Sequence, residues 1–203
     1  NNTDVFWPVA NGPHNVTVAN TGGIDLGTSS TTSRTVNGLF RTSAGVTMSN
    51  GSVLTINGTA QLDNGGYFVS TPVYGNTSTM TYTTGGSYDV GNEWTANSIT
   101  PGPGAPQNVT IQNNTAVYMP TGNRGIAGDL TMTSGSLTLN ATSGDLFVAG
   151  NWNRAAGTSF APNNRAVFFN GSATQVLNSS GTETFNYLLI QGSGTLQLTN
   201  GTD

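Results

Sequence analysis

The stretch GDLTMTSGSLTLNATSGDLFVAGNW, residues 128–152, places apolar side chains at alternate positions and fills the gaps with Thr, Ser and Gly. In DLTMT, Leu130 and Met132 would face one way and Thr131 and Thr133 the other, because successive side chains leave an extended strand on opposite faces. SLTLN and DLFVAG repeat the pattern. The stretch therefore predicts several short, half-buried strands separated by corners of Gly, Ser and Asn.

The composition of the whole chain favours an all-β fold with a nearly neutral surface. Only 7% of the 203 residues are charged, against roughly 25% in an ordinary soluble domain. Gly and Pro interrupt nearly every window, and no dozen residues show the apolar spacing of an amphipathic helix. Aromatic residues make up 8% and the net charge is −4, which does not match the composition of disordered segments.

Several function classes are excluded by the residue types that the chain lacks. All five basic residues are arginines scattered singly, so no basic stripe exists to bind nucleic acid. There is no cysteine, which excludes disulfides and thiolate metal sites. No apolar run approaches the roughly 18 residues of a membrane span, and the start NNTDVFW suits a processed product or an excised segment. We expect an extracellular or cell-surface location, without nucleic acid or membrane insertion.

The chain also repeats itself over a long distance. PHNVTV at 13–18 returns as PQNVTI at 106–111, nearly half the chain further on. We therefore predict a first β half at 1–96, a Pro/Gly connection at 97–106 and a second β half at 107–203. The connection would be either a linker or a loop on one continuous stack.

Two β architectures fit these short strands. Breaks such as Ser134-Gly135 would close antiparallel hairpins and build a β-sandwich or jelly roll. Alternatively, the strands would wind into coils stacked about 4.8 Å apart. Gly-Asp-Leu at 128–130 recurs at 144–146, as a repeating coil would require. We favour the β-solenoid, because repeats bury a continuous core by stacking like on like.

The second half of the chain resembles a known class of repeats. AGNWNRAAGTSF is followed by AVFFNGSATQVL and TFNYLLI, within a region that covers most of residues 94–203. This pattern resembles the Gly/Ser/Thr/Asn-rich repeats of large secreted bacterial surface proteins and adhesins, and the first half resembles them more loosely. The resemblance implies a β-solenoid or β-rich stalk of a very long protein, and it implies no catalytic residue.

Few side chains are available for catalysis or metal binding. Asp89 and Glu93 are the closest carboxylate pair, as a glycosidase would need, but the Gly and Asn between them favour a solvated turn. Asp129 and Asp145 would hold a calcium ion if they stacked on adjacent coils, although Asp after Gly is also common in turns. His14 is the only histidine, which excludes a His-based zinc cluster. We expect no enzyme activity and no cofactor, with calcium as the alternative.

The expected function is that of a non-catalytic structural subunit or stalk segment of an extracellular filament or adhesin. A stack of strands ends in unpaired N–H and C=O groups, and this chain has no Lys and few other charges to guard them. We expect copies of the chain to polymerise by strand pairing, or by donation of residues 4–9 or 195–199. The residues expected at this contact are Asp4, Val5, Phe6, Trp7, Val9, Leu196 and Leu198.

A carbohydrate-binding surface module is the second hypothesis, and a β-solenoid polysaccharide lyase or hydrolase is the third. Exposed tryptophans would stack on the rings of surface glycans, whereas buried ones would fill a corner of a coil, the commoner situation. TSTMTYTT at 77–84 would align Thr hydroxyls on one face, although β-propensity alone also explains such a strand. The expected ligand contacts are Trp94, Trp152, Thr77, Thr79, Thr81 and Thr83.

Overall fold

The alternating sequence forms a parallel β-solenoid of about eight turns. The computed structural model describes residue 7 and residues 12–27, 33–51 and 53–199, and over these ranges it contains 23 short strands and no helix. Each full coil passes through three faces, and the named strands pair in parallel with strands of the neighbouring coils. The predicted all-β solenoid is therefore confirmed, and the antiparallel sandwich is wrong.

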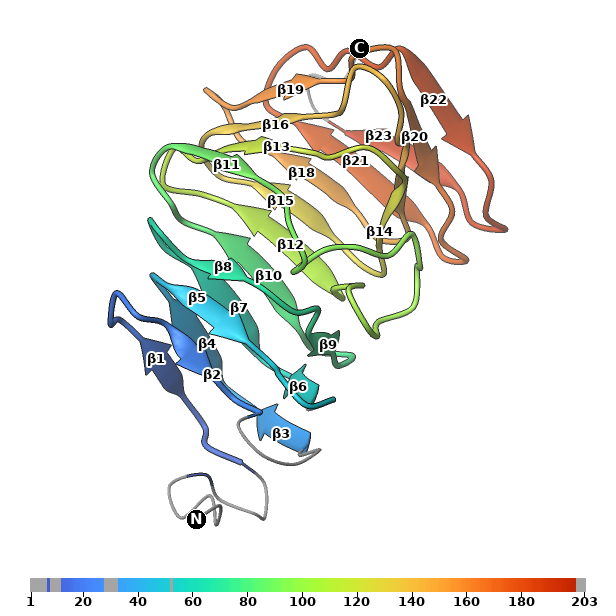
Figure 1. Ribbon diagram of the computed structural model, residues 1–203. Helices are drawn as coiled ribbons and strands as arrows, with labels where there is room; N and C mark the ends of the chain where they lie inside the picture. Colours follow the sequence, from blue (N-terminus) through green and yellow to red (C-terminus); the bar gives the residue numbers. More distant parts are fainter. Residues whose placement is uncertain (1–6, 8–11, 28–32, 52, 200–203) are drawn as a thin grey trace.

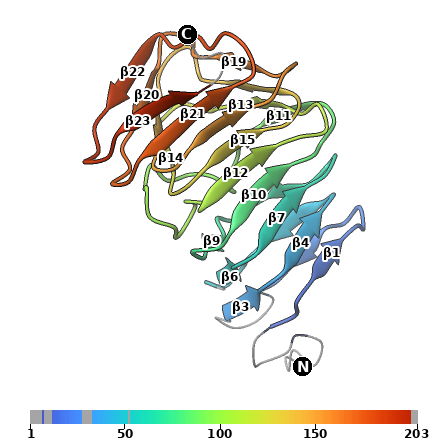
Figure 2. The same ribbon diagram turned by 180° about the vertical axis from the view of Figure 1, so that it is seen from behind.

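The first face is a single nine-stranded sheet that runs the length of the stack, with β1 and β23 at its opposite ends (Figures 1 and 2). It consists of β1 (Val16–Val18), β4 (Leu39–Thr42), β7 (Thr59–Leu62), β10 (Thr79–Tyr82), β12 (Asn108–Ile111), β15 (Leu130–Met132), β18 (Trp152–Arg154), β21 (Gln175–Ser179) and β23 (Leu196–Thr199).

The other two faces are each divided into two sheets. The second face has β2 (Ile24–Asp25), β5 (Gly45–Thr47) and β8 (Tyr67–Phe68), then β11 (Ser87–Asp89), β13 (Ala116–Tyr118), β16 (Ser136–Thr138) and β19 (Ser159–Ala161). The third face has β3 (Ser33–Val36), β6 (Val53–Ile56) and β9 (Val73–Tyr74), then β14 (Arg124–Ile126), β17 (Leu146–Val148), β20 (Ala166–Phe169) and β22 (Tyr187–Ile190).

The core consists of columns of inward-facing side chains that stack from coil to coil. Along the first face, Val16 pairs with Phe40, Phe40 with Ala60, Ala60 with Met80 and Met80 with Val109. The small Ala60 lies between two large side chains, so the column fills without overpacking. The sequence repeat of PHNVTV and PQNVTI therefore connects two strands that lie four coils apart in one column.

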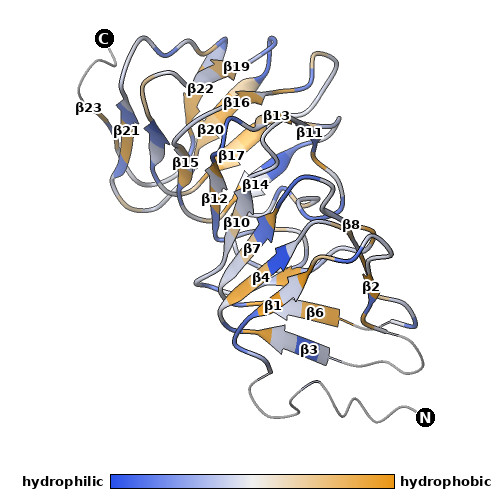
Figure 3. Ribbon diagram, turned by 90° about the vertical axis from the view of Figure 1, so that its left-hand side faces the viewer, coloured by the Kyte–Doolittle hydropathy of each residue, from blue (hydrophilic) through white to orange (hydrophobic). Residues whose placement is uncertain are grey.

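The outer surface of the first face is polar, which explains the Thr and Asn residues between the apolar ones. Hydrophilic and hydrophobic residues accordingly mix within individual strands (Figure 3). One outward column is in register over all nine strands: Thr17, Arg41, Gln61, Thr81, Thr110, Thr131, Asn153, Asn178 and Thr199.

Side chains at the corners tie each coil to the next. The Asn15 Oδ1 accepts the Leu39 N–H at 2.8 Å, and the Asn108 Oδ1 accepts the Asp129 N–H at 2.9 Å. The Asp129 Oδ1 in turn accepts the Asn151 N–H at 2.7 Å. These bonds satisfy backbone donors where the strands are interrupted, which is why amides and carboxylates occur at the corners.

The Pro/Gly segment lies inside one long coil of the stack. The step from Met80 to its partner Val109 takes more chain than the step from Phe40 to its partner Ala60. The additional chain occupies the third face, where the Gly102 carbonyl accepts the Tyr74 N–H and the Ala96 carbonyl accepts the Gly125 N–H. The first face passes through this region without a break, because β10 pairs directly with β12.

Candidate functional site

The last third-face strand exposes side chains that would be core residues elsewhere in the stack. Leu188 and Ile190 of β22 pair with Val167 and Phe169 of β20, which are fully buried. Leu188 and Ile190 are instead 39% and 56% exposed. Their side chains continue the inward-facing columns of Val167 and Phe169, and within the described part of the chain no further coil covers them.

The last strand of the first face also exposes an inward-facing apolar side chain. Leu198 of β23 pairs with the buried Leu177 of β21, but it is itself 55% exposed. Both β22 and β23 lie at the end of their sheets and pair on one side only. Among the described residues, the C-terminal end of the solenoid is therefore an apolar surface bordered by the outer edges of these two strands, which we call the open end.

At the opposite end, Arg34 of the third-face strand β3 lies beside Trp7. Arg34 pairs with the fully buried Leu54 and so faces inward, where its Nε donates to the Leu26 carbonyl at 2.5 Å. The guanidinium carbon lies 5.4 Å from the centroid of the Trp7 ring, and that half-buried ring packs against the core. The first face ends in a different strand of this coil, β1. The two ends of the stack thus differ in chemistry.

The residues predicted to form the subunit contact are distributed over both ends. Leu198 lies exposed on the open end and Leu196 lies there half-buried, whereas Trp7 lies at the first coil. The others, Asp4, Val5, Phe6 and Val9, lie outside the described residues. Their contact with a second subunit stays a prediction.

The two tryptophans predicted to bind ligand are fully buried, so they have no ring face to offer to a sugar. The Trp94 Nε1 donates to the Gly125 carbonyl at 2.8 Å. The Trp152 Nε1 donates to the Glu183 Oε2 at 3.1 Å, and its ring packs edge-on against Phe160. Ligand contact through Trp94 and Trp152 is therefore wrong, because each side chain fills the interior of a coil.

The four predicted threonines do not form one open rank of hydroxyls. Thr77 is exposed and Thr79 is half-buried, but Thr81 is buried in the outer surface of the sheet. The hydroxyls of Thr77 and Thr83 donate to backbone carbonyls of the preceding coil, at 2.6 and 2.8 Å. Two of the four hydroxyls thus form hydrogen bonds between adjacent coils. Ligand contact by these four threonines stays a prediction.

Asp89 and Glu93 do not form a catalytic pair. Asp89 is exposed on the outer surface of β11, whereas Glu93 is fully buried inside the coil. One carboxyl group faces solvent and the other faces the interior of the coil, so the two do not flank one sugar bond.

Glu93 lies in a polar part of the interior, beside Tyr74 and Tyr82. Its Oε1 accepts the Gly91 N–H at 3.0 Å and the Tyr82 hydroxyl at 3.3 Å, while its Oε2 is buried without a hydrogen-bond partner among the described residues. The Tyr74 hydroxyl donates to the Glu93 carbonyl at 2.8 Å. Burial raises the pKa of Glu93, and the hydrogen bonds that its carboxylate accepts offset this only in part.

The predicted calcium pair lies within one coil. Asp129 precedes β15 on the first face and Asp145 precedes β17 on the third, so the two Gly-Asp-Leu triplets occupy two corners of the same coil. The premise that they stack on adjacent coils is wrong. Each carboxylate accepts a backbone N–H of the next coil, from Asn151 and from Ala166. No group of three or more His, Cys, Asp or Glu suited to a metal ion occurs within the described ranges. Calcium binding stays an untested alternative.

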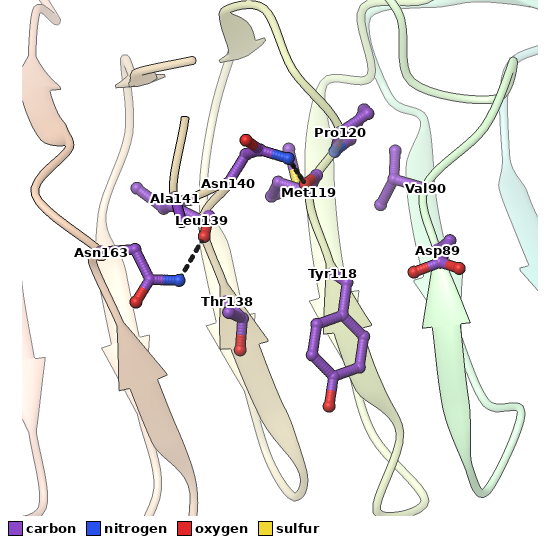
Figure 4. A pocket seen from close by; sticks show the side chains of 10 residues that line it. All are labelled: Asp89, Val90, Tyr118, Met119, Pro120, Thr138, Leu139, Asn140, Ala141 and Asn163. Atoms are coloured by element: carbon purple, nitrogen blue, oxygen red, sulfur yellow. Dashed lines mark hydrogen bonds between the residues drawn. The ribbon is translucent and has the colours of Figure 1, made fainter. Parts of the chain in front are cut away.

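A groove of ≈ 380 Å³ runs over the outer surface of the second face (Figure 4). Three outward residues in register line it, since Asp89 of β11 pairs with Tyr118 of β13, and Tyr118 pairs with Thr138 of β16. The corner residues Asn140 and Asn163 close one side, where they donate from Nδ2 to the Met119 and Leu139 carbonyls of the preceding coil. Of the residues that line the groove, only Asp89 was identified from the sequence. The others were missed because the three strands that form the groove are far apart in the chain.

Comparisons with known proteins give no further identification: no family model, no curated protein and no solved structure matches the chain. Among the described residues, no helix has the length and apolar character to cross a membrane.

Proposed function

We propose that the chain is a non-catalytic structural segment of an extracellular filament or surface stalk, and that copies of it join end to end through the open end. The observation that carries this proposal is the exposure of the inward-facing Leu188, Ile190 and Leu198. Burying an apolar side chain of this size contributes about 1.5–3 kcal/mol. The surface therefore has both the free energy and the strand edges that favour the addition of another coil.

The symmetry of the stack supports an open-ended assembly. The first face ends in β23 on one side and in β1 on the other, and all of its strands run parallel. When β23 of one copy pairs with β1 of the next, the sheet continues in the same direction. A head-to-tail contact that extends the stack along its own axis leaves an end open for the next copy, so it produces a filament.

Sedimentation velocity across a wide range of protein concentration, together with negative-stain electron microscopy, tests this proposal. We expect the unmodified chain to form linear oligomers that lengthen with concentration. Ile190→Lys places a charge on the inward side of β22 and should leave monomers. Tyr187→Lys is the matched control, because Tyr187 lies on the same strand with a similar exposed fraction but faces outward.

Two results would contradict the proposal. If the unmodified chain stayed monomeric at high concentration, it would form no end-to-end contact, and the proposal would be wrong. If Tyr187→Lys abolished assembly as fully as Ile190→Lys, the outer surface of the third face would be the contact, and stacking at the open end would be wrong.

A further inference from the structure

Asp89 differs from the other carboxylates that the structure describes. Six of these seven side chains accept hydrogen bonds that hold the fold: Asp25, Asp63, Glu93, Asp129, Asp145 and Glu183. The exposed Asp89 carboxylate accepts none from the described residues, although it lies in a groove. The chain has few charged residues, and no hydrogen bond within the described fold accounts for the presence of a carboxylate at position 89.

Tyr118 lies beside Asp89 in the same groove. Its side chain is 41% exposed, its ring packs against no other aromatic ring of the described residues, and its hydroxyl makes no hydrogen bond to another of them. The ring lies between the Asp89 carboxylate and the Thr138 hydroxyl, one coil away on each side (Figure 4). Adjacent coils are about 4.8 Å apart, so the three groups form a row of about 10 Å along the stack.

We propose that this groove binds neutral sugar rings of an extended polysaccharide. An ionised carboxylate accepts strong hydrogen bonds from hydroxyl groups, and a phenol ring packs against the apolar face of a pyranose. The Thr138 hydroxyl supplies a donor and an acceptor, and the Asn163 Oδ1, which accepts no bond from the described residues, supplies a second acceptor. The groups thus match a ligand with many hydroxyls on a flat ring.

The same groups disfavour the alternative ligands. A single carboxylate gives far fewer oxygens than the six to eight that calcium takes. The groove follows the outer surface across several coils, which suits an extended chain better than an anchoring side chain. The site lies in the middle of the stack, so it does not depend on end-to-end assembly.

Isothermal titration calorimetry with soluble hexasaccharides tests the proposal, with cellohexaose, laminarihexaose, xylohexaose and mannohexaose as probes. We expect at least one probe to bind the unmodified chain. Tyr118→Ala should weaken that binding about tenfold through loss of the ring contact. Asp89→Asn should weaken it several-fold. Tyr67→Ala is the control, because Tyr67 is similarly exposed on the same face but lies outside the groove.

Three outcomes would overturn the proposal. The first is that none of the four neutral probes binds. The second is that Tyr67→Ala weakens binding as much as Tyr118→Ala does. The third is that Tyr118→Ala binds the probe with the affinity of the unmodified chain. As a further comparison, the cationic chitosan hexamer should bind no better than the neutral probes. If it alone bound, with an affinity that vanished in salt, the groove would be a charge contact through Asp89 rather than a site for neutral sugars.

Discussion

Glu93 is a buried residue whose protonation makes the stability of the fold depend on pH. Because burial raises the pKa of Glu93, the folded chain holds this proton more tightly than the unfolded chain does. The contribution of the proton to stability is therefore complete below the ordinary pKa of 4.5 and declines as the pH rises from there through the raised pKa of the folded state.

Glu93→Gln should remove this decline, because the amide has nearly the same shape and stays neutral at every pH. We expect the melting temperature at neutral and alkaline pH to rise by about 2–4 °C, the scale of about 1 kcal/mol in a domain of this size. Thermal unfolding followed by circular dichroism over a pH series measures the effect. Asp89→Asn, which alters an exposed carboxylate four positions earlier, should leave the decline in place. Parallel profiles for Glu93→Gln and the unmodified chain would disprove the explanation.

At the scale of the elements, the corners determine which residues the stack tolerates. Gly58 precedes β7, and a Cβ there would lie 2.0 Å from the Gly38 carbonyl oxygen of the preceding coil. Gly86 precedes β11, and a Cβ there would meet nothing within 4 Å. The first glycine is thus required by the close approach of two coils, whereas the second is not.

Gly58→Ala should destabilise the fold by about 1–3 kcal/mol, because the backbone of the adjacent coil must shift to admit the methyl group. Gly86→Ala should change stability by less than about 0.5 kcal/mol, as expected for a surface substitution. Urea unfolding of the three proteins gives both values. Equal midpoints for Gly58→Ala and Gly86→Ala would show that the coils do not pack as tightly as the structure indicates.

The strands were predictable from the sequence, but their positions in the coil were not. Alternation identifies β15, β16 and β17 directly, because an inward apolar residue must recur at every second position. Alternation does not show which corner a Gly-Asp-Leu triplet occupies, and the two triplets lie closer together in the chain than one full coil. Similarly, the groove joins Asp89, Tyr118 and Thr138 from three successive coils, and only the register of those coils brings them together.

At the scale of the whole molecule, the faces differ in their continuity. The nine-stranded sheet passes from β10 to β12 without interruption. On the second face no strand pairing joins β8 to β11, and on the third face the loop at 90–107 separates β9 from β14. The coil of β7 to β9 and the coil of β10 and β11 thus share one complete sheet instead of three, and the predicted division at 97–106 falls within the second of these coils.

This reduced contact predicts that the two halves of the solenoid open separately. The stability of a repeat stack is approximately the sum of coil stabilities and nearest-neighbour interfaces, so a weak interface becomes a boundary for partial unfolding. Hydrogen exchange in mild urea, read by mass spectrometry, should show peptides within residues 16–74 losing protection together, while peptides within 108–179 remain protected. Gly58→Ala should accelerate exchange in the first group only. A single cooperative loss of protection across both groups would mean that the continuous nine-stranded sheet alone couples the halves, and the proposed boundary would be wrong.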